Sequence, residues 1–426
     1  MTNTNNRAKN IKRSRKYKYV DRPFILFMLT LFQVITFLPV IFTSEGINIS
    51  VAALFLGYLF FEWIYVGFMH YALKKVNFEL EFIAFFLSGI GLCLTASVDA
   101  KDMFKQMITV FAGVLVYDVL LWFLMDVKRV MAVRTPLAVF TLVFLLGSFV
   151  FIRSFVGPIN GAYNWIVIGN MFSFQPSEFV KIAFVFVGAA TLDKLITSKN
   201  IFMYLAFSGV CIGTLVLMKD FGTALIFFFT FVVIAFLRSG DFRTVLFFGA
   251  VAVFGAVVII YLLPHVASRF ASYRHVWEDI NGKGYQQTRV LIYSVSGGLL
   301  GLGVGNGKLR NVYAATTDLV FGMICEEMGI IVAFSIVIAF AFLAIYAVKS
   351  SKSSPSTFYA IAACSASAML LFQICLNIFG ITDLLPLTGV TLPFISQGGS
   401  SMICCWALFA FIKAADIRAY PKTYKV

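Results

Sequence analysis

The sequence has little charge and few of the residues that build metal sites or disulfide frameworks. Only 13% of its 426 residues are charged, and it contains 3 His and 7 Cys. The cysteines lie inside apolar runs without a C-x-x-C pair, and the histidines lack the spacing of metal ligands. These absences argue against a zinc site or a disulfide framework, and they indicate that the cysteines are small buried hydrophobic residues.

Hydrophobic residues, in contrast, make up 60% of the chain, whereas a soluble domain has about 45–50%. The net charge of +14 comes from 34 Lys and Arg against 20 Asp and Glu. The basic residues gather in the N-terminal tail and in short loops between apolar runs. This is the distribution found in membrane proteins with basic cytoplasmic loops, so nucleic-acid binding is not expected.

Apolar runs of about 20 residues, each long enough to cross a bilayer as a helix, recur along the chain. The candidate spans are 24–43, 50–73, 81–98, 104–125, 134–153, 176–195, 201–218, 222–238, 243–263, 319–347, 357–380 and 399–415. The first run has no signal cleavage site, so it is predicted to be retained. The fold class is therefore an all-α polytopic membrane protein with about 12 transmembrane helices.

Basic residues fall on alternate connections between these spans, which predicts a membrane orientation. Residues 1–22 would form a basic cytoplasmic tail, and 419–426 would form a cytoplasmic tail at the other end. The interval 264–318, between the ninth and tenth spans, would then be a large extracellular loop. The unusual polar residues gather on this outer side, so we expect the chemistry there.

Asp318 ends the long polar interval and has two interpretations. It can cap the N-terminus of the tenth span, a position that Asp favours. It can instead be a general base at the edge of the apolar region. Glu326 and Glu327 lie further into the same span, where two adjacent acids are costly, and a structural ion pair is expected to hold them.

Other polar residues lie at the predicted outer ends of the spans. Glu178 and Lys181 are three residues apart, so they can neutralise each other or leave Lys181 free to bind an anion. Asp220 is a candidate N-cap of the eighth span. The outer cations that could hold a pyrophosphate are Arg153, Lys219, Arg269, Arg274, Arg289, Lys308 and Arg310.

Two glycine-rich stretches interrupt the outer part of the chain. Residues 297–307 lack the βαβ context of a phosphate loop, which favours a bent, closely packed re-entrant loop instead. Residues 384–402 read LLPLTGVTLPFISQGGSSM, with two Pro and three Gly. Irregular backbone at membrane depth must line a cavity or be buried in protein, so this stretch is expected to do one or the other.

Several motifs together resemble the SEDS family (shape, elongation, division and sporulation), which includes the FtsW, RodA and SpoVE-type proteins. In family order they are NGAYNWI (160–166), FQPSEFVKIA (174–183), DFGTA (220–224), WEDINGKGYQ (277–286), GGLLGLGVGNG (297–307), TTDLVFGMICEEMG (316–329) and PLTGVTLPFISQGGSSM (386–402). The family commonly has ten spans. The resemblance therefore implies a SEDS-like bundle at 76–418 and two additional N-terminal helices at 23–75.

The resemblance also implies an activity, namely a peptidoglycan glycosyltransferase that polymerises lipid II at the outer face of the bacterial cytoplasmic membrane. The growing glycan would be linked to polyprenyl pyrophosphate, membrane lipid would surround the chain, and a class B penicillin-binding protein would be its partner. The family's essential Asp falls on Asp318 as the catalytic residue. A divalent cation, Mg²⁺ or Mn²⁺, held by Asp318 is an open alternative to direct base catalysis.

Further site residues are carried over with the motifs or taken from the outer-face polar residues. The candidate substrate-binding residues are Lys181, Glu178, Arg153, Arg269, Arg274, Gln286, Ser396 and Ser400. The candidate structural or functional residues are Asp220, Trp165, Glu326, Glu327, Pro393, Gly398 and Gly399. The chain departs from the family pattern at Tyr163 and Asn164, where basic residues are usual, at Thr316, where His is usual, and at Gln397, where an aromatic is usual.

Two other functions fit the same composition. A lipid II flippase would also use a large helical bundle with acids and broken helices, but it should place ionisable groups near the midplane. A non-catalytic scaffold for a penicillin-binding protein would tolerate substitution of Asp318. The gathering of polar residues at the outer face favours the glycosyltransferase.

Overall fold

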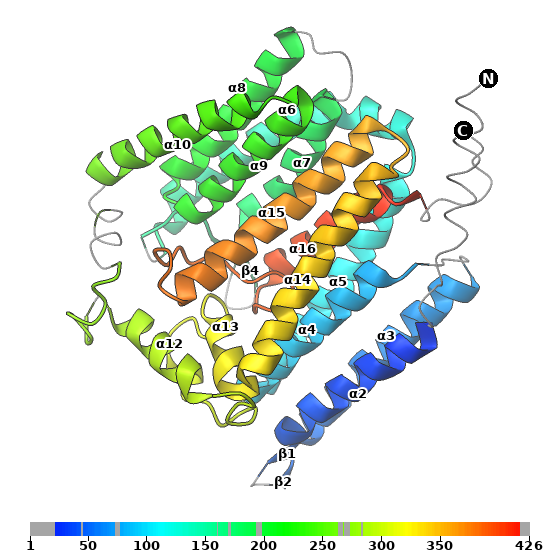
Figure 1. Cartoon of the computed structure of the whole chain (residues 1–426), viewed down its shortest axis with the longest axis vertical. Coiled ribbons are helices and arrows are strands. Elements are labelled where there is room, and N and C mark those ends of the chain that lie inside the picture. The colour runs from blue at the N-terminus through cyan, green and yellow to red at the C-terminus, as the bar shows by residue number, and fades with distance from the viewer. Residues whose placement is uncertain are drawn as a thin grey trace.

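The structure is a computed structural model that describes residues 22–43, 46–72, 77–159, 161–168, 172–192, 198–262, 267, 273–282 and 284–417. Its long helices are α2 (Arg22–Ile41), α3 (Ile49–Tyr71), α4 (Glu79–Val98), α5 (Ala100–Leu124), α6 (Val127–Phe151), α7 (Pro176–Leu192), α8 (Ser198–Leu217), α9 (Phe221–Ser239), α10 (Phe242–Leu262), α14 (Gly329–Lys352), α15 (Thr357–Ile381) and α16 (Gly399–Ala414). They pack as a helical bundle (Figure 1).

Shorter elements connect the long helices. They are α12 (Tyr285–Ser296), α13 (Val320–Met323), the π-helices η1 (Ile152–Val156) and η3 (Ile324–Met328), and the 3-10 turn η2 (Leu309–Asn311). Two short antiparallel hairpins, β1 (Phe42–Thr43) with β2 (Gly46–Ile47) and β3 (Ile166–Ile168) with β4 (Phe172–Phe174), complete the described strands.

The predicted fold class is confirmed. In the described part of the chain, a long helix lies at each of the twelve predicted spans. Eight of the described helical segments are long and apolar enough to cross a membrane by length and composition, and α8, α10 and α16 contain shorter apolar helices. The tenth span differs from the prediction because it is broken into α13, η3 and α14 rather than being one helix.

Local sequence signals explain where several helices begin and end. Asp99 accepts a hydrogen bond from the Lys101 N–H and caps α5, and Asp126 caps α6 in the same way through the Lys128 N–H. Helix α9 ends at Gly240, whose φ of 66° is the left-handed conformation that glycine adopts readily.

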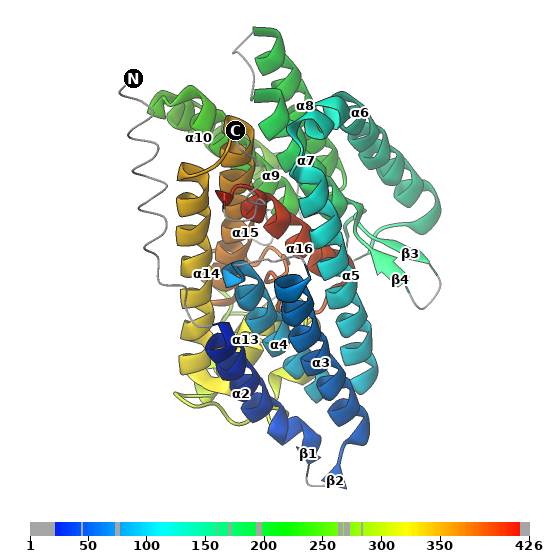
Figure 2. The ribbon, with the colours of Figure 1, turned by 90° about the vertical axis from the view of Figure 1, so that its right-hand side faces the viewer.

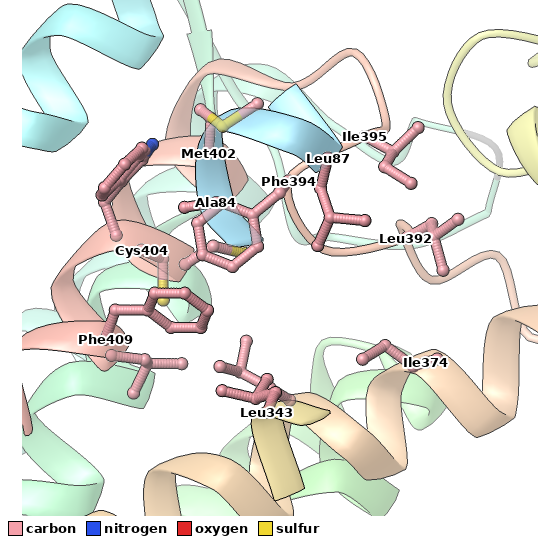
Figure 3. Packing of buried hydrophobic residues seen from close by; sticks show 14 of the residues in the cluster. Ala84, Leu87, Leu343, Ile374, Leu392, Phe394, Ile395, Met402, Cys404 and Phe409 are labelled. Carbon is pink, nitrogen blue, oxygen red and sulfur yellow. The ribbon is translucent and has the colours of Figure 1, made fainter. Parts of the chain in front are cut away.

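Helix α16 lies at the centre of the bundle and contacts α5, α15 and α7. Trp406 of α16 is fully buried, with its ring centroid 5.3 Å from that of Phe85 in α4. Phe394, just before α16, packs on Phe409 of α16 with a centroid distance of 4.5 Å. Figure 3 shows this cluster, in which the segment before α16 contributes core residues together with α4, α14 and α15.

The first two helices lie along one flank of the bundle, where α2 contacts α4 and α3 contacts α5, while α8 and α10 lie on the opposite flank (Figures 1 and 2). Inside the N-terminal pair, Gln33 donates a 2.9 Å hydrogen bond to the buried carboxylate of Glu62. Large apolar side chains such as Phe60 and Val253 are exposed on these flanks, at 70% and 67%. Such surfaces fit lipid rather than water.

Candidate active site

Asp318 follows a tight turn just before α13. Ala314 has a φ of 61°, and its carbonyl accepts hydrogen bonds from both the Asp318 and the Leu319 N–H groups, at 3.0 and 3.1 Å. The N-cap position of α13 belongs to Leu319, without a side-chain capping bond. The interpretation of Asp318 as a helix N-cap is therefore wrong, because the turn places it one residue too early.

The Asp318 carboxylate is half-buried and lies against the glycine-rich stretch that precedes α16. A Cβ built on Gly389 would stand 3.4 Å from Oδ2 of Asp318, which is ordinary van der Waals contact. Gly389 itself has a φ of 72°, a conformation that favours glycine. Residues 318 and 389, which belong to two separate motifs, are thus brought together.

Residues 316–318, which we call the strap, each accept a hydrogen bond at the backbone carbonyl. Gln397 donates its N–H to the Thr316 carbonyl at 2.8 Å, and the Ser396 hydroxyl donates to the Thr317 carbonyl. Asn377 of α15 donates to the Asp318 carbonyl at 2.8 Å. Each strap residue therefore has its carbonyl fixed by a residue of α15 or of the stretch before α16.

Side chains from neighbouring helices satisfy the irregular backbone of residues 386–398. Asn377 donates to the Val390 carbonyl at 2.7 Å, and Gln373 donates to the Thr391 carbonyl at 2.9 Å. Gln106 of α5 donates to the Ile395 carbonyl at 3.3 Å. Of the two expectations for this stretch, burial in protein is the one observed for residues 392–396, where polar side chains replace the missing helical bonds.

Gly91 of α4 lets the backbone of the irregular stretch 386–398 approach α4 closely. A Cβ built on Gly91 would lie 2.3 Å from the Ile395 carbonyl oxygen. We expect Gly91→Val to lower the stability of the purified chain by about 1–3 kcal/mol, as overpacked cores do, because backbone rather than a flexible side chain must move. Thermal unfolding in mild detergent measures this.

The matched control is Gly57→Val in α3, where no atom lies within 4 Å of the added Cβ. If the two variants melt at the same temperature, the close approach of α4 to Ile395 has no energetic weight.

The starts of α7, α9 and α16 meet beside the same stretch. Asp220 accepts a bond from the Thr223 N–H and so caps α9, which confirms the predicted cap. Gln175 donates its side-chain amide to Asp220 at 2.7 Å and its N–H to the Ser400 hydroxyl at 3.3 Å. Three motifs far apart in the sequence therefore form one corner of the site.

Glu178 and Lys181 form a buried ion pair with an N–O distance of 2.8 Å. The Lys181 ammonium also donates to the Gln373 side-chain oxygen at 2.9 Å. Only 2% of the Lys181 side chain and 6% of the Glu178 side chain are exposed. Of the two alternatives for this pair, mutual neutralisation is the one observed.

The ion pair continues into a polar chain toward α16. Gln373 donates to the Thr391 hydroxyl at 3.1 Å as well as to its carbonyl, and the Thr391 and Ser401 hydroxyls lie 2.8 Å apart. The charges of Glu178 and Lys181 are thus tied to the backbone that carries Gly389 and Ser396.

Glu326 and Glu327 hold the glycine-rich loop 297–307 and the residues that follow it. Glu326 accepts from the Lys308 and Leu309 N–H groups at 2.7 and 2.9 Å, and Glu327 accepts from the Gly305 N–H at 2.9 Å. The expected ion pair is wrong: within the described residues no salt bridge reaches either carboxylate. Backbone N–H groups take the place of a cation, as carboxylates readily allow.

The glycines of this loop permit the close approach. A Cβ on Gly301 would lie 2.2 Å from the Glu327 carbonyl oxygen, and Gly301 has a φ of 82°. The Leu302 and Gly303 N–H groups donate to the Glu326 and Glu327 carbonyls at 2.9 and 3.0 Å. The predicted bent, closely packed loop is confirmed, and its bonds to η3 coincide with the break in the tenth span.

The remaining predicted site residues lie in different places, some at the surface and some within the stretch 386–398. Arg153 and Arg274 are exposed, each near an aromatic ring, at 6.0 Å from Phe149 and 5.3 Å from Tyr273. Gln286 of α12 donates to the Tyr313 carbonyl at 2.8 Å. Trp165 is half-buried, Pro393 is buried, Gly398 and Gly399 start α16, and Arg269 lies outside the described residues.

Sequence reasoning missed three amide side chains that organise the site: Gln106, Gln373 and Asn377. Each is buried within a predicted span, at 2–3% exposure. The sequence feature that could have identified them is an amide side chain inside an apolar run. Such a group needs a hydrogen-bond partner wherever it is buried. Here the partners are backbone carbonyls of the irregular stretch.

The residues near Asp318 do not include a cluster of metal-ligating side chains in the described part of the chain. In the part of the chain that the structure describes, no three His, Cys, Asp or Glu side chains gather as they would around a metal ion. Around the strap, Asp318 is a single carboxylate among amide and hydroxyl side chains, so these residues do not form a dedicated all-protein site for Mg²⁺ or Mn²⁺.

Known proteins resemble the chain over most of its length. Peptidoglycan glycosyltransferase RodA of Mycobacterium tuberculosis strain H37Rv is 28% identical over 352 residues, which cover 76% of this chain and 75% of that protein. Stage V sporulation protein E of Bacillus subtilis strain 168 is 33% identical over 250 residues, which cover 57% of this chain and 68% of that protein.

Solved structures share the fold. A chain of a peptidoglycan synthase complex, described as coordinating polymerization and crosslinking, has a TM-score of 0.66 at 22% identity and covers 79% of this chain and 96% of that chain. The rod shape determining protein RodA of Thermus thermophilus has a TM-score of 0.58 at 22% identity, with 79% and 95% covered.

A family model described as "Cell cycle protein", which joins FtsW, RodA and SpoVE, matches residues 80–420. The match begins at the start of α4, so α2 and α3 precede it. Since the matched residues are well over half of the 426-residue chain, the chain belongs to the FtsW, RodA and SpoVE family.

Proposed function

We propose that the chain is a peptidoglycan glycosyltransferase that polymerises lipid II into glycan strands. The observation that carries this proposal is Asp318, a half-buried carboxylate on a strap fastened at three consecutive carbonyls. A carboxylate held in this way is suited to accept a proton in a fixed direction. Relatives of the chain named peptidoglycan glycosyltransferase support the reaction class.

The proposed reaction is an inverting glycosyl transfer. The C4 hydroxyl of an incoming lipid II sugar attacks the anomeric carbon of the growing chain, and the bond from that carbon to the polyprenyl pyrophosphate breaks. The Asp318 carboxylate takes the hydroxyl proton as the new glycosidic bond forms. The pyrophosphate leaves with the bonding electrons, and its negative charge requires cations nearby.

We assign the pyrophosphate to Arg153, Arg269 and Arg274 rather than to Lys181. The Lys181 charge is already neutralised by Glu178 in the buried pair, whereas Arg153 and Arg274 are exposed. Guanidinium groups bind phosphate oxygens through charge-assisted bonds. Glu178, Lys181, Ser396 and Ser400 would then shape the site through their bonds within the protein, and Gln286 would hold α12 near it.

The setting follows from the charge pattern and the family. The chain would lie in the bacterial cytoplasmic membrane with both termini in the cytoplasm, so that Asp318 faces the outer side. A class B penicillin-binding protein would crosslink the glycan that the chain makes. The resemblance to a chain from a peptidoglycan synthase complex supports such a partner.

The test is glycan formation from lipid II by the purified full-length chain, with and without a class B penicillin-binding protein. Strands resolved on a gel from the chain alone or with its partner are the expected result. If neither preparation forms polymer, the proposal is wrong, and movement of lipid II across vesicle membranes would then favour the flippase.

A further inference from the structure

The side chains of Thr316, in the strap, and Gln397, just before Gly398 and α16, bond to each other. The Thr316 hydroxyl donates a 2.6 Å hydrogen bond to the Gln397 side-chain oxygen, across 81 residues of sequence. The Gln397 N–H donates back to the Thr316 carbonyl at 2.8 Å. The two residues therefore hold each other by one bond between side chains and one through the backbone.

This pair differs from the other bonds along the strap. The Thr317 and Asp318 carbonyls accept from Ser396 and Asn377, so those bonds involve only the backbone of the strap. Among these three contacts, the one at Thr316 alone includes the side chain of a strap residue. The position of the strap is thus sensitive to which residue stands at 316.

The turn before the strap couples the position of Thr316 to that of Asp318. Ala314 is in a left-handed conformation, and its carbonyl accepts from three successive N–H groups, those of residues 317–319. The segment from the turn to Asp318 has no spare residues to absorb a shift at Thr316. Both Thr316 and Gln397 are half-buried, so water can compete for their polar atoms once the bond is broken.

We propose that Thr316 and Gln397 are positioning residues that form a latch and fix the Asp318 carboxylate in its reactive place. The latch rests on the proposed function, since it acts through Asp318. It predicts that loss of the bond between the side chains lowers the rate of the chemical step and leaves lipid II binding nearly unchanged. A misplacement of about 1 Å in an active site can cost about 10²-fold in rate.

The experiment measures kcat and KM for lipid II polymerisation by the full-length chain with its crosslinking partner. Thr316→Val, which keeps the shape and removes the hydroxyl, should lower kcat about tenfold or more with KM within about twofold. Thr316→Ser restores the donor and should recover most of kcat. Gln397→Met, which removes the acceptor, should resemble Thr316→Val.

The double variant decides whether the two residues act together. If they form one latch, Thr316→Val with Gln397→Met should lower kcat no further than the worse single variant. If the two effects multiply, the residues act separately and the latch is wrong. Unchanged kcat in both single variants, or a loss that merely follows the folded fraction in thermal unfolding, would equally overturn it.

Two controls separate this inference from the proposed function. Thr382→Val makes the same change at an exposed threonine whose hydroxyl bonds within its own helix, to the Ile378 carbonyl at 2.9 Å, and should leave kcat unchanged. Asp318→Asn is assayed beside it. Polymer from the wild type, none from Asp318→Asn and full activity in the latch variants would refute the latch alone. Normal polymerisation by Asp318→Asn would refute the role of Asp318 itself.

Discussion

Asp318→Asn is expected to lower the rate of glycan polymerisation by about 10²–10⁴-fold, the usual contribution of a general base. Asn has nearly the same shape but cannot accept the proton of the attacking hydroxyl. The described backbone bonds of Asp318, from its N–H to Ala314 and from Asn377 to its carbonyl, are untouched by the change. The loss should therefore fall on kcat, measured with purified lipid II, while the chain stays folded.

Asp383→Asn is the matched control. Asp383 follows α15, is half-buried and has a φ of 57°, a conformation that Asn adopts as readily as Asp. This variant should polymerise lipid II at the wild-type rate. Near-normal polymerisation by Asp318→Asn would instead show that Asp318 is not the general base of the reaction.

The helices could be predicted from the sequence because their cause is local. About 20 apolar residues in a row suffice to specify a membrane span. Asp220 was correctly predicted as a cap because its capping bond comes from Thr223, three residues further along the chain. In each case the residues that decide the structure are neighbours in the chain.

The break in the tenth span could not be predicted in this way. An apolar run that begins at Leu319 indicates one helix, whereas the structure has α13, η3 and α14. The bonds from Gly305, Lys308 and Leu309 to Glu326 and Glu327 accompany this break, together with Gly329 at a φ of 81°. These contacts depend on how a distant loop folds back, which spacing within the span does not encode.

The site itself was predicted in part. The motifs that contain Asp318, Asp220 and Ser400 meet around the irregular stretch before α16, whereas the roles of these residues stay predictions. Thr316 and Gln397 each differ from the family pattern, yet their contact across 81 residues becomes visible only in the structure. A linear sequence identifies such residues one at a time and does not show that they bond to each other.

Lys181→Met should be the most destabilising of the substitutions considered, at about 3–5 kcal/mol, because it leaves the buried Glu178 carboxylate without its cation. Oε2 of Glu178 already has no hydrogen-bond partner, and among the described ion pairs Lys181 is the cation that reaches this carboxylate. The free energy of unfolding in mixed detergent micelles measures the effect. Since Lys181 also bonds to Gln373, which supports the Thr391 backbone, activity should fall with stability.

The control is another lysine in an i, i+3 pair. Lys105 bonds to Asp102 at 3.0 Å, but its side chain is 63% exposed, so Lys105→Met should cost less than about 1 kcal/mol. The double variant Lys181→Met with Glu178→Gln removes both buried charges and should recover much of the lost stability, because neutral groups are less costly to bury. If the double variant is as unstable as Lys181→Met, packing rather than charge explains the loss. If Lys181→Met is instead stable and only binds lipid II more weakly, the buried pair is a substrate site and Lys181 joins the cations that hold the pyrophosphate.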